Sequence, residues 1–368
     1  MASPVESNGR VLLTVSGVVD LDARSDAANG LRPARDYVEL AEAMNADVVD
    51  VAEARRRSGR LGALVERFAG PAVLIAWVCF RQRRRYDAVF TDGEQVGLPL
   101  ALLCRLTLRR PFAHVMIVHI MSVKKKALLF KLFRLGRYID TSLVYSSRQK
   151  RFIVDDLGQR ADRVVFTPFM VDTRFFAPHH VTPAAGDRPM ICSAGLEFRD
   201  YPTLVEAVRG LDVRVVIAAA SPWSKRDDTT QHAELPANVE VDRFNLFDLR
   251  QLYTDAAFVV MPLVDVEFQA GVTTILEAMA MGRAVVCSRT RGQTDVVVEG
   301  DSGLYVPPGD VAALRAAITA LLADPAKAER LGAGGRSYVE RECDVRVYAD
   351  RLATITSDAA RRYRQLPR

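Results

Sequence analysis

Short apolar runs alternate with helix-like segments along this chain, and no other feature constrains its fold as strongly. In the first half, strand-like runs are followed by polar or turn residues at 11–15, 47–51, 86–93, 111–121 and 141–145. Segments with the apolar spacing of helices, such as 34–44, separate these runs. This alternation is typical of a parallel sheet with helices packed on both faces.

The alternation then starts again after a segment rich in proline. Residues 179–189 contain Pro183 and Pro189 and are the predicted linker. Further strand-like runs follow it at 190–195, 213–219, 239–241, 257–262 and 284–288. The sequence therefore predicts a second α/β layer structure of the same kind as the first.

The length agrees with two domains, because single cores stop growing at roughly 250–300 residues and this chain has 368. We predict doubly wound α/β domains at 1–177 and 178–344, and a helix at 345–368 that crosses back to the first domain. Ligands of such sheets bind beyond the carboxyl ends of the strands. Two domains facing across a cleft are therefore expected to hold their ligands in it.

Composition excludes several classes of protein. Hydrophobic residues make up 49% of the chain and the formal net charge is +5, which is not the composition of a disordered protein. The five cysteines include no Cys-x-x-Cys pair, which predicts a reduced, cytoplasmic protein without a zinc site. No apolar run approaches the about 20 residues of a membrane span.

The most informative segment is a loop at 263–272 followed by a helix at 273–281. Ala270 and Gly271 let backbone N–H groups approach an anion, and the first turn of the helix adds unpaired N–H groups. This arrangement suits a diphosphate. Glu277, about one turn further on, can accept hydrogen bonds from a ribose diol. On spacing alone, the alternative is that Gly271 only makes a turn and Glu277 faces solvent.

Five segments in this order resemble the motifs of family 4 retaining glycosyltransferases: 169–176 (FMVDTRFF), 193–206, 277–288 (EAMAMGRAVVCS), 291–297 (RGQTDVV) and 300–310 (GDSGLYVPPGD). The similarity covers about residues 140–345, and the first 110 residues only weakly. It implies a GT-B fold of two Rossmann-like domains. It also implies transfer of a sugar, of the hexosyl type, from a nucleoside diphosphate to an acceptor hydroxyl with retention of configuration.

The resemblance also implies a set of donor-binding residues, with two departures from the family pattern. The position eight residues before Glu277 is normally a glutamate, but here it is Gln269, with Glu267 two residues earlier. Gln269 is the preferred sugar-facing residue and Glu267 the alternative. In place of the family's lysine, Arg199 is the expected diphosphate clamp. The other expected donor contacts are Gly17, Gly195, Lys225, Phe244, Ala270, Gly271, Val272 and Thr273.

The expected catalytic residues are His119, Gln269 and Arg199. His119 ends a strand of the first domain, where similar enzymes place a histidine near the sugar; a buried structural histidine is the alternative. The resemblance implies front-side attack assisted by the leaving phosphate, without a dedicated base. No metal and no cofactor are expected, and Asp20-Leu21-Asp22 is interpreted as a polar loop.

Residues 124–137 contain six basic side chains and no acidic one, with leucines and phenylalanines at helical spacing. This segment either contacts a membrane surface, which would place the protein at the inner face of the membrane, or packs on its own sheet. Nucleic acid is not expected, because aromatic residues are not interleaved with the charges.

The acceptor is not identified by the sequence; lipid-linked, polysaccharide and small-molecule substrates all remain open. Two other functions also remain open: a nucleotide-sugar epimerase or hydrolase of the same fold, and a non-catalytic nucleotide-sugar binding module.

Overall fold

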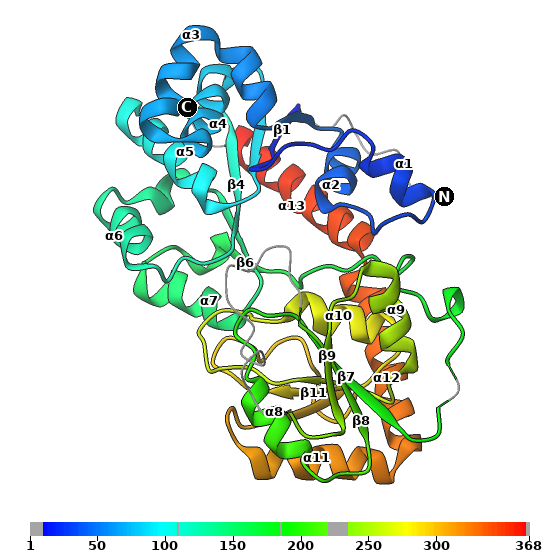
Figure 1. Cartoon of the computed structure of the whole chain (residues 1–368). Helices are drawn as coiled ribbons and strands as arrows, with labels where there is room; N and C mark the ends of the chain where they lie inside the picture. Colours follow the sequence, from blue (N-terminus) through cyan, green and yellow to red (C-terminus); the bar gives the residue numbers. More distant parts are fainter. Residues whose placement is uncertain (1–9, 109, 185, 220–234, 366–368) are drawn as a thin grey trace. The chain divides into compact units, whose positions relative to one another are not determined.

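The computed structural model describes residues 10–108, 110–184, 186–219 and 235–365. The chain forms two compact units (Figure 1). Unit 1 comprises Met1–Ala28, Ala34–Thr167 and Arg346–Arg368, and unit 2 comprises Asn29–Pro33 and Pro168–Val345. Each unit has a parallel sheet of six strands and its own apolar core.

The sheet of unit 1 has the strand order β2-β1-β3-β4-β5-β6. Strands β1 and β4 are buried along their whole length, as expected for continuous apolar runs covered on both faces. The order reverses at β1, which pairs with β2 on one side and β3 on the other. The strands are β1 (Val11–Thr14), β2 (Asp47–Val49), β3 (Ala88–Thr91), β4 (Ala113–Val118), β5 (Thr141–Val144) and β6 (Val164–Phe166).

Two apolar clusters join the helices of unit 1 to this sheet. One packs α3, α4 and α5 against β1 and β3, and the other packs α5 and α6 against β4 and β5. The helices are α1 (Ala23–Ala28), α2 (Asp36–Met44), α3 (Val51–Ala69), α4 (Pro71–Gln82), α5 (Glu94–Thr107), α6 (Lys124–Leu132) and α7 (Ser147–Arg151). A short 3₁₀ helix, η1 (Leu135–Tyr138), follows α6.

The sheet of unit 2 has the order β12-β11-β10-β7-β8-β9. Apolar side chains alternate between its two faces: Val259 and Met261 of β10 enter one core, and Val260 enters the other. Helices α9 and α10 cover the first face, and α8 and α11 cover the second. The strands are β7 (Met190–Ala194), β8 (Arg214–Ala218), β9 (Val239–Asp242), β10 (Val259–Met261), β11 (Val285–Ser288) and β12 (Gly303–Val306).

The order of these strands defines where a ligand of unit 2 is expected. Strands β8 and β9 follow β7 on one side, whereas β10, β11 and β12 lie on the other side. This reversal between β7 and β10 is a topological switch point, where open α/β sheets bind ligands. The helices are α8 (Tyr201–Val208), α9 (Leu246–Asp255), α10 (Val272–Ala280), α11 (Val311–Ala323) and α12 (Pro325–Tyr338).

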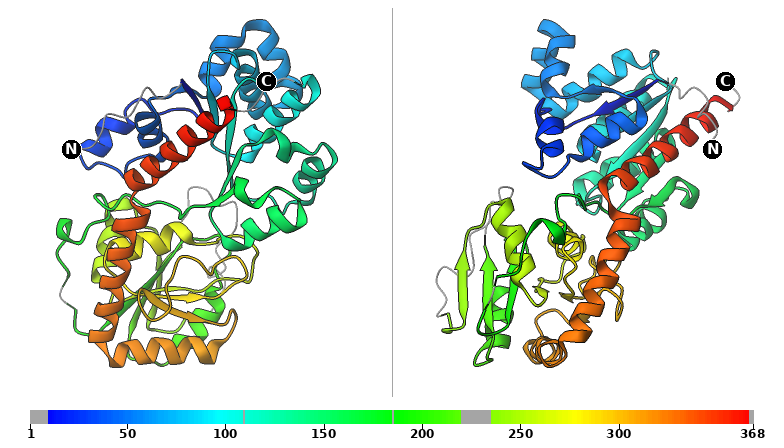
Figure 2. Two further views of the ribbon diagram at one scale, coloured as in Figure 1. Left: turned by 180° about the vertical axis from the view of Figure 1, so that it is seen from behind. Right: turned by 90° about the vertical axis from the view of Figure 1, so that its right-hand side faces the viewer.

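The division between the units lies at Pro168, earlier in the chain than the predicted boundary at residue 178. The segment after Pro168 pairs with the end of unit 2, because the Val171 amide donates to the Cys343 carbonyl at 2.9 Å. The Thr173 hydroxyl also donates to Asp344 at 2.5 Å. Helix α13 (Val345–Gln365), red in Figures 1 and 2, belongs to unit 1 from Arg346 onward.

Within the described residues, no helix is both long and apolar enough to cross a membrane.

Candidate functional site

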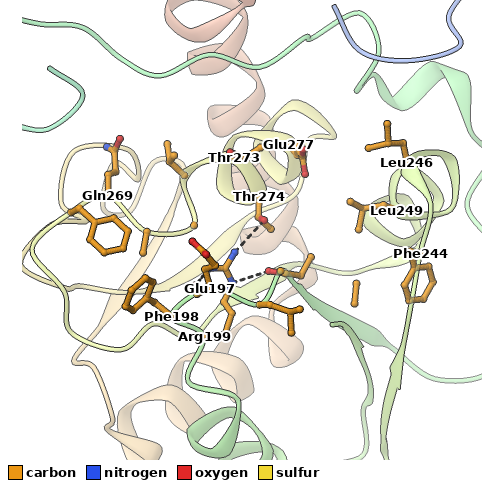
Figure 3. Close-up of a pocket in the computed structure, with 18 residues that line it drawn as sticks. Glu197, Phe198, Arg199, Phe244, Leu246, Leu249, Gln269, Thr273, Thr274 and Glu277 are labelled. Atoms are coloured by element: carbon orange, nitrogen blue, oxygen red, sulfur yellow. Dashed lines mark hydrogen bonds between the residues drawn. The ribbon is translucent and has the colours of Figure 1, made fainter. Parts of the chain in front are cut away.

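A cavity of about 420 Å³ lies in unit 2, beyond the carboxyl ends of β7, β8 and β10 (Figure 3). Its position coincides with the switch point between β7 and β10. Nine residues predicted from the sequence line it: Gly195, Arg199, Phe244, Gln269, Ala270, Gly271, Val272, Thr273 and Glu277.

One wall of the cavity is the first turn of α10. Gly271 precedes this helix with φ 74°, a left-handed conformation that glycine adopts without strain. Among the described residues, no side chain caps this helix. The residues of the first turn, Val272, Thr273 and Thr274, line the cavity. Their position presents unpaired N–H groups and the positive end of the helix dipole, a combination that binds anions.

Arg199 lies beside this turn and is only 8% exposed. Its Nε donates to the Ala194 carbonyl at 2.8 Å and its Nη1 donates to the Glu197 carbonyl at 2.8 Å. A longer contact of 3.4 Å joins Nη2 to the Thr274 hydroxyl (Figure 3). Burial lowers the pKa of the guanidinium, and in the described part of the chain no carboxylate pairs with it. A bound anion would therefore stabilise this buried cation.

Gly195 makes room for the Arg199 side chain. A Cβ atom at Gly195 would lie 2.4 Å from Nη2 of Arg199, and the residue has φ 95°. The glycine therefore allows both the turn after β7 and the close approach of the guanidinium to the backbone. The sequence predicts Gly195 as a donor contact, and in the structure this glycine lines the cavity and makes room for Arg199.

Glu277 lies one turn into α10, on the cavity wall. The Tyr253 hydroxyl donates to Glu277 Oε2 at 3.0 Å. Burial raises the pKa of the Glu277 carboxyl to about 7, although this hydrogen bond and the charge of Arg199 act in the opposite direction. No described residue donates to the other carboxylate oxygen, so Glu277 can accept a hydrogen bond from a ligand.

The two ends of the cavity differ in chemistry. Figure 3 shows Phe244, Leu246 and Leu249 together at one end and Gln269 at the other, with Arg199 between them. The apolar end suits a flat ring such as a nucleobase. Oε1 of Gln269 is buried and has no hydrogen-bond partner among the described residues. A buried amide oxygen without a partner is costly, and a ligand hydroxyl would satisfy it.

A second loop, 290–293, holds the loop that carries Gln269. The Gln293 side chain is fully buried and its Nε2 donates to the Ala270 carbonyl at 2.8 Å. Gly292 donates its N–H to the Val266 carbonyl at 2.9 Å. A Cβ atom at Gly292 would lie 2.2 Å from the carbonyl oxygen of Phe268. Gln293 is not predictable from the sequence, since only the folded chain brings it beside Ala270.

Glu267 is not part of the cavity wall. Arg291 Nη1 donates to its carboxylate at 3.1 Å, and Arg291 Nε donates to Asp265 at 2.9 Å. Of the two residues considered for the sugar-facing position, the structure thus brings Gln269 to the cavity and ties Glu267 to a surface arginine. Lys225, the weaker predicted cation, lies outside the described residues.

Gly17 and His119 both lie in unit 1, beyond the carboxyl ends of β1 and β4. Near Gly17, the Thr14 hydroxyl donates to Asp92 at 2.7 Å and the Ser16 amide donates to the same carboxylate at 2.6 Å. A Cβ atom at Gly17 would meet nothing within 4 Å. Hydrogen bonds to Asp92 therefore hold the residues before Gly17, whereas the space beside Gly17 itself is open.

The His119 side chain is exposed, unlike that of His114. Its Nε2 lies 2.9 Å from the Asp92 carbonyl oxygen, and its backbone amide donates to Glu94 at 2.9 Å. The buried Glu94 also accepts from Lys126 Nζ at 2.6 Å. His114 is buried against Thr91, and burial lowers its pKa to about 3, so it is a neutral core residue.

Comparison with known proteins adds three findings. Residues 197–324 match the family model described as "Glycosyl transferases group 1". A glycogen synthase of Mycobacterium tuberculosis (strain ATCC 25618 / H37Rv) is 30% identical over 139 residues, 38% of this chain and 33% of that protein. The GDP-mannose-dependent alpha-(1-6)-phosphatidylinositol monomannoside mannosyltransferase of Mycolicibacterium smegmatis (strain ATCC 700084 / mc(2)155) is 38% identical over 82 residues, 22% of each chain. The chain thus covers about a third or less of these relatives.

Solved structures resemble nearly the whole chain. Sucrose-phosphate synthase from Thermosynechococcus elongatus has a TM-score of 0.69 at 18% identity, covering 94% of this chain and 98% of that one. Anabaena HepE in complex with UDP-glucose has a TM-score of 0.68 at 15% identity, covering 95% and 100%. With the two parallel sheets, these likenesses confirm the predicted GT-B fold of two Rossmann-like domains.

Proposed function

We propose that this chain is a glycosyltransferase that moves a sugar from a nucleoside-diphosphate sugar to an acceptor hydroxyl. One observation carries the proposal: the N-terminus of α10, the buried Arg199 and the carboxylate of Glu277 line a single cavity at the switch point of unit 2. The match of residues 197–324 to glycosyl transferases group 1 supports it. The complex of the similarly folded HepE with UDP-glucose gives further support.

In this proposal each part of the donor has its own contacts. The diphosphate lies against Arg199 and the amides of Gly271 and Val272, with Thr273 and Gly195 beside it. The Ala270 amide, also expected to bind the donor, donates instead to the Phe268 carbonyl at 2.9 Å. The ribose diol donates to Glu277, and the nucleobase lies toward Phe244. Negative charge grows on the diphosphate as the bond from the sugar C1 to the phosphate oxygen breaks. Donors fixed in place before the reaction stabilise that charge without reorganising.

The transferred hexose lies toward Gln269, whose buried Oε1 would accept from a sugar hydroxyl. The amide is neutral, so it orients the sugar and does not offset positive charge on the ring as a carboxylate does. We propose transfer with retention by front-side attack, in which the leaving phosphate receives the acceptor proton. No metal and no cofactor take part in this mechanism.

The acceptor is proposed to bind unit 1, where Gly17 and His119 lie beyond the ends of β1 and β4. His119 is proposed to be a catalytic residue near the transferred sugar, as the family resemblance implies. A cytoplasmic setting is part of the proposal and is supported by the five cysteines, all of them free and buried.

A donor panel tests the proposal. UDP-, GDP- and TDP-sugars are each added to the protein, with thermal shift and isothermal titration as measurements. We expect at least one of them to raise the melting temperature. Arg199→Ala should weaken its binding roughly tenfold to a hundredfold, the range expected for hydrogen bonds to a charged group. Arg209→Ala, which removes an exposed arginine paired with Glu206, is the control.

Activity separates the competing functions. Release of nucleoside diphosphate that depends on an added acceptor identifies a transferase, and NMR of the new linkage shows whether configuration is retained. Isomerisation of the donor sugar without an acceptor would instead identify an epimerase. Absence of binding by every sugar nucleotide would contradict the donor site itself.

A further inference from the structure

The positive charge of this protein is concentrated in one stretch of unit 1. Residues 51–137 contain eighteen Lys and Arg but only five Asp and Glu, a net charge of +13, whereas the whole chain carries +5. The remainder is therefore net negative, at −8. This stretch forms the successive helices α3, α4, α5 and α6 (Figure 1). The donor site of unit 2 accounts for none of this charge.

Helix α3 carries an exposed apolar stripe. Leu61, Leu64 and Phe68 follow at intervals of three and four residues, which places them on one face of the helix. All three are more than half exposed, and Phe68 is 79% exposed. Arg60 and Arg67 flank the stripe and are exposed as well. Large apolar side chains grouped in this way on a solvent-exposed surface mark an interaction site.

The acidic residues of α3 do not neutralise these two arginines. Glu53 pairs with Arg56 and Arg57, and Glu66 pairs with Arg55, with a shortest contact of 2.6 Å. Within the part of the chain that the structure describes, neither Arg60 nor Arg67 has a carboxylate partner. Their charges are available beside the leucines and the phenylalanine.

Helix α6 repeats the arrangement. Leu128 and Leu132, one turn apart, are 65% and 69% exposed. The exposed Lys124, Lys125 and Lys131 surround them, and no described carboxylate pairs with these lysines. Only Lys126 turns inward, to the buried Glu94. Phe130 anchors the opposite face of the helix in the core of unit 1.

We propose that the exposed faces of α3 and α6 bind the surface of an anionic phospholipid bilayer. Aliphatic side chains and a phenylalanine enter the boundary between headgroups and acyl chains, while the flanking arginines and lysines attract lipid phosphates. The chemistry fits a bilayer better than a nucleic acid, since four of the five apolar side chains are leucines, which do not stack on bases. The proposal does not depend on which sugar unit 2 binds.

Vesicle sedimentation with the whole protein tests this proposal. Vesicles of equal parts phosphatidylglycerol and phosphatidylcholine should bind the protein, and pure phosphatidylcholine vesicles should bind it much more weakly. Binding should weaken at about 0.5 M salt, where surface charges are screened. The variant L61S/L64S/F68S, altered only at exposed positions, should lower the partition coefficient about tenfold or more, as the loss of apolar contact predicts. K124E/K125E/K131E should lower it to a similar extent.

The matched control is V18S/L21S. Val18 and Leu21 are 70% and 90% exposed but lie beside Asp20 and Asp22 instead of basic residues. This variant should partition as the unaltered protein does. Thermal melting and circular dichroism verify that each variant is folded.

Three results would overturn the proposal. The first is failure of the unaltered protein to bind the anionic vesicles. The second is equal binding by L61S/L64S/F68S. The third is single-stranded DNA that displaces the protein from vesicles and binds L61S/L64S/F68S without loss, which would make the surface a general polyanion site.

Discussion

The position of the Arg199 side chain depends on the absence of a side chain at Gly195. Adding one methyl group at Gly195 tests this dependence. In Gly195→Ala the new methyl would lie 2.4 Å from Nη2 of Arg199, at a φ of 95°. We expect the guanidinium to move out of its carbonyl contacts, so that donor affinity falls roughly tenfold or more, as for loss of a hydrogen bond to a charged group. Titration calorimetry with the donor found in the panel measures this change.

Gly210→Ala separates backbone strain from displacement of the arginine. Gly210 also has positive φ, 72°, but a Cβ atom there meets nothing within 4 Å. That substitution should lower stability by about 1–2 kcal/mol and leave donor affinity unchanged. Equal donor affinity in both variants would refute the link between Gly195 and Arg199.

Glu277 makes donor binding depend on pH. Burial raises the pKa of its carboxyl to about 7, so lowering the pH from 8 to 6 protonates it in the empty site. The neutral carboxyl is a weaker acceptor for the ribose diol, and affinity should fall by up to about tenfold per pH unit below 7. An intact sugar nucleotide is the proper ligand, because neither of its phosphates titrates in this range.

Glu277→Gln provides the comparison for this pH profile. It keeps an acceptor oxygen but cannot ionise, so its affinity should be weaker at pH 8 and nearly constant down to pH 6. A profile for the unaltered protein as flat as that of Glu277→Gln would argue against the ribose contact.

Site residues that belong to a local sequence motif could be predicted. Residues that reach the site only through folding could not. Gly271 and Glu277 are predicted from a loop followed by a helix, and Arg199 from its place in the motif that the family resemblance identifies. Gln293 was missed, since the oxygen it donates to belongs to Ala270, 23 positions away along the chain. The spacing from Glu277 also could not decide whether Gln269 or Glu267 faces the sugar. That choice depends on Arg291, which lies beside Glu267 only after the two loops have packed together.

At the scale of elements, the loop 290–293 acts as a support for the donor loop 263–271. In Gly292→Ala the added methyl would lie 2.2 Å from the Phe268 carbonyl oxygen, and two backbone segments must separate. Such overpacking destabilises by about 1–3 kcal/mol, and here we also expect donor affinity to drop, because Gln269 and Ala270 move with the loop. Calorimetry and urea unfolding measure the two effects.

Gly334→Ala is the matched control for that prediction. Its Cβ atom would lie 2.2 Å from the Asp301 carbonyl oxygen, the same overlap at a position outside the cavity wall. Both variants should lose stability, but only Gly292→Ala should bind the donor less tightly. A parallel loss of affinity in Gly334→Ala would indicate general loosening of unit 2.

The strands could be predicted from apolar runs, with the exception of two edge strands. The run at 141–145 corresponds to β5, and the helical spacing at 34–44 corresponds to α2. By contrast, β6 has three residues and β12 begins at a glycine. Their pairing with β5 and β11 identifies β6 and β12 as strands.

At the scale of the whole molecule, the two units should respond separately to a change in one of them. The hydroxyl of Tyr348 in α13 lies 2.8 Å from that of Tyr145, and both side chains are buried in unit 1. Tyr348→Phe should lower the free energy of unfolding of unit 1 by about 1 kcal/mol, the net value of one such hydrogen bond. Donor affinity, which resides in unit 2, should not change. A weaker donor affinity in this variant would count against separate units.

The boundary between the units could be predicted only approximately. Prolines at 183 and 189 indicated a linker at 179–189, but Arg336 Nη1 donates to the carbonyl of Phe176 at 2.8 Å and thereby holds the preceding segment in unit 2. Composition shows where a chain bends easily. It does not show which unit a polar segment joins, because that depends on partners about 160 residues later.

The return of α13 to unit 1 also sets an order of events during synthesis. Unit 1 is interrupted by the whole of Pro168–Val345 and lacks α13 until residues from Arg346 onward have been made. At about 5–20 residues per second, α13 follows β6 after roughly 10 to 35 seconds of translation. Unit 2, continuous in sequence over Pro168–Val345, can fold within that interval. Unit 2 should therefore complete its folding first. Unit 1 can complete its folding only after α13 has been synthesised.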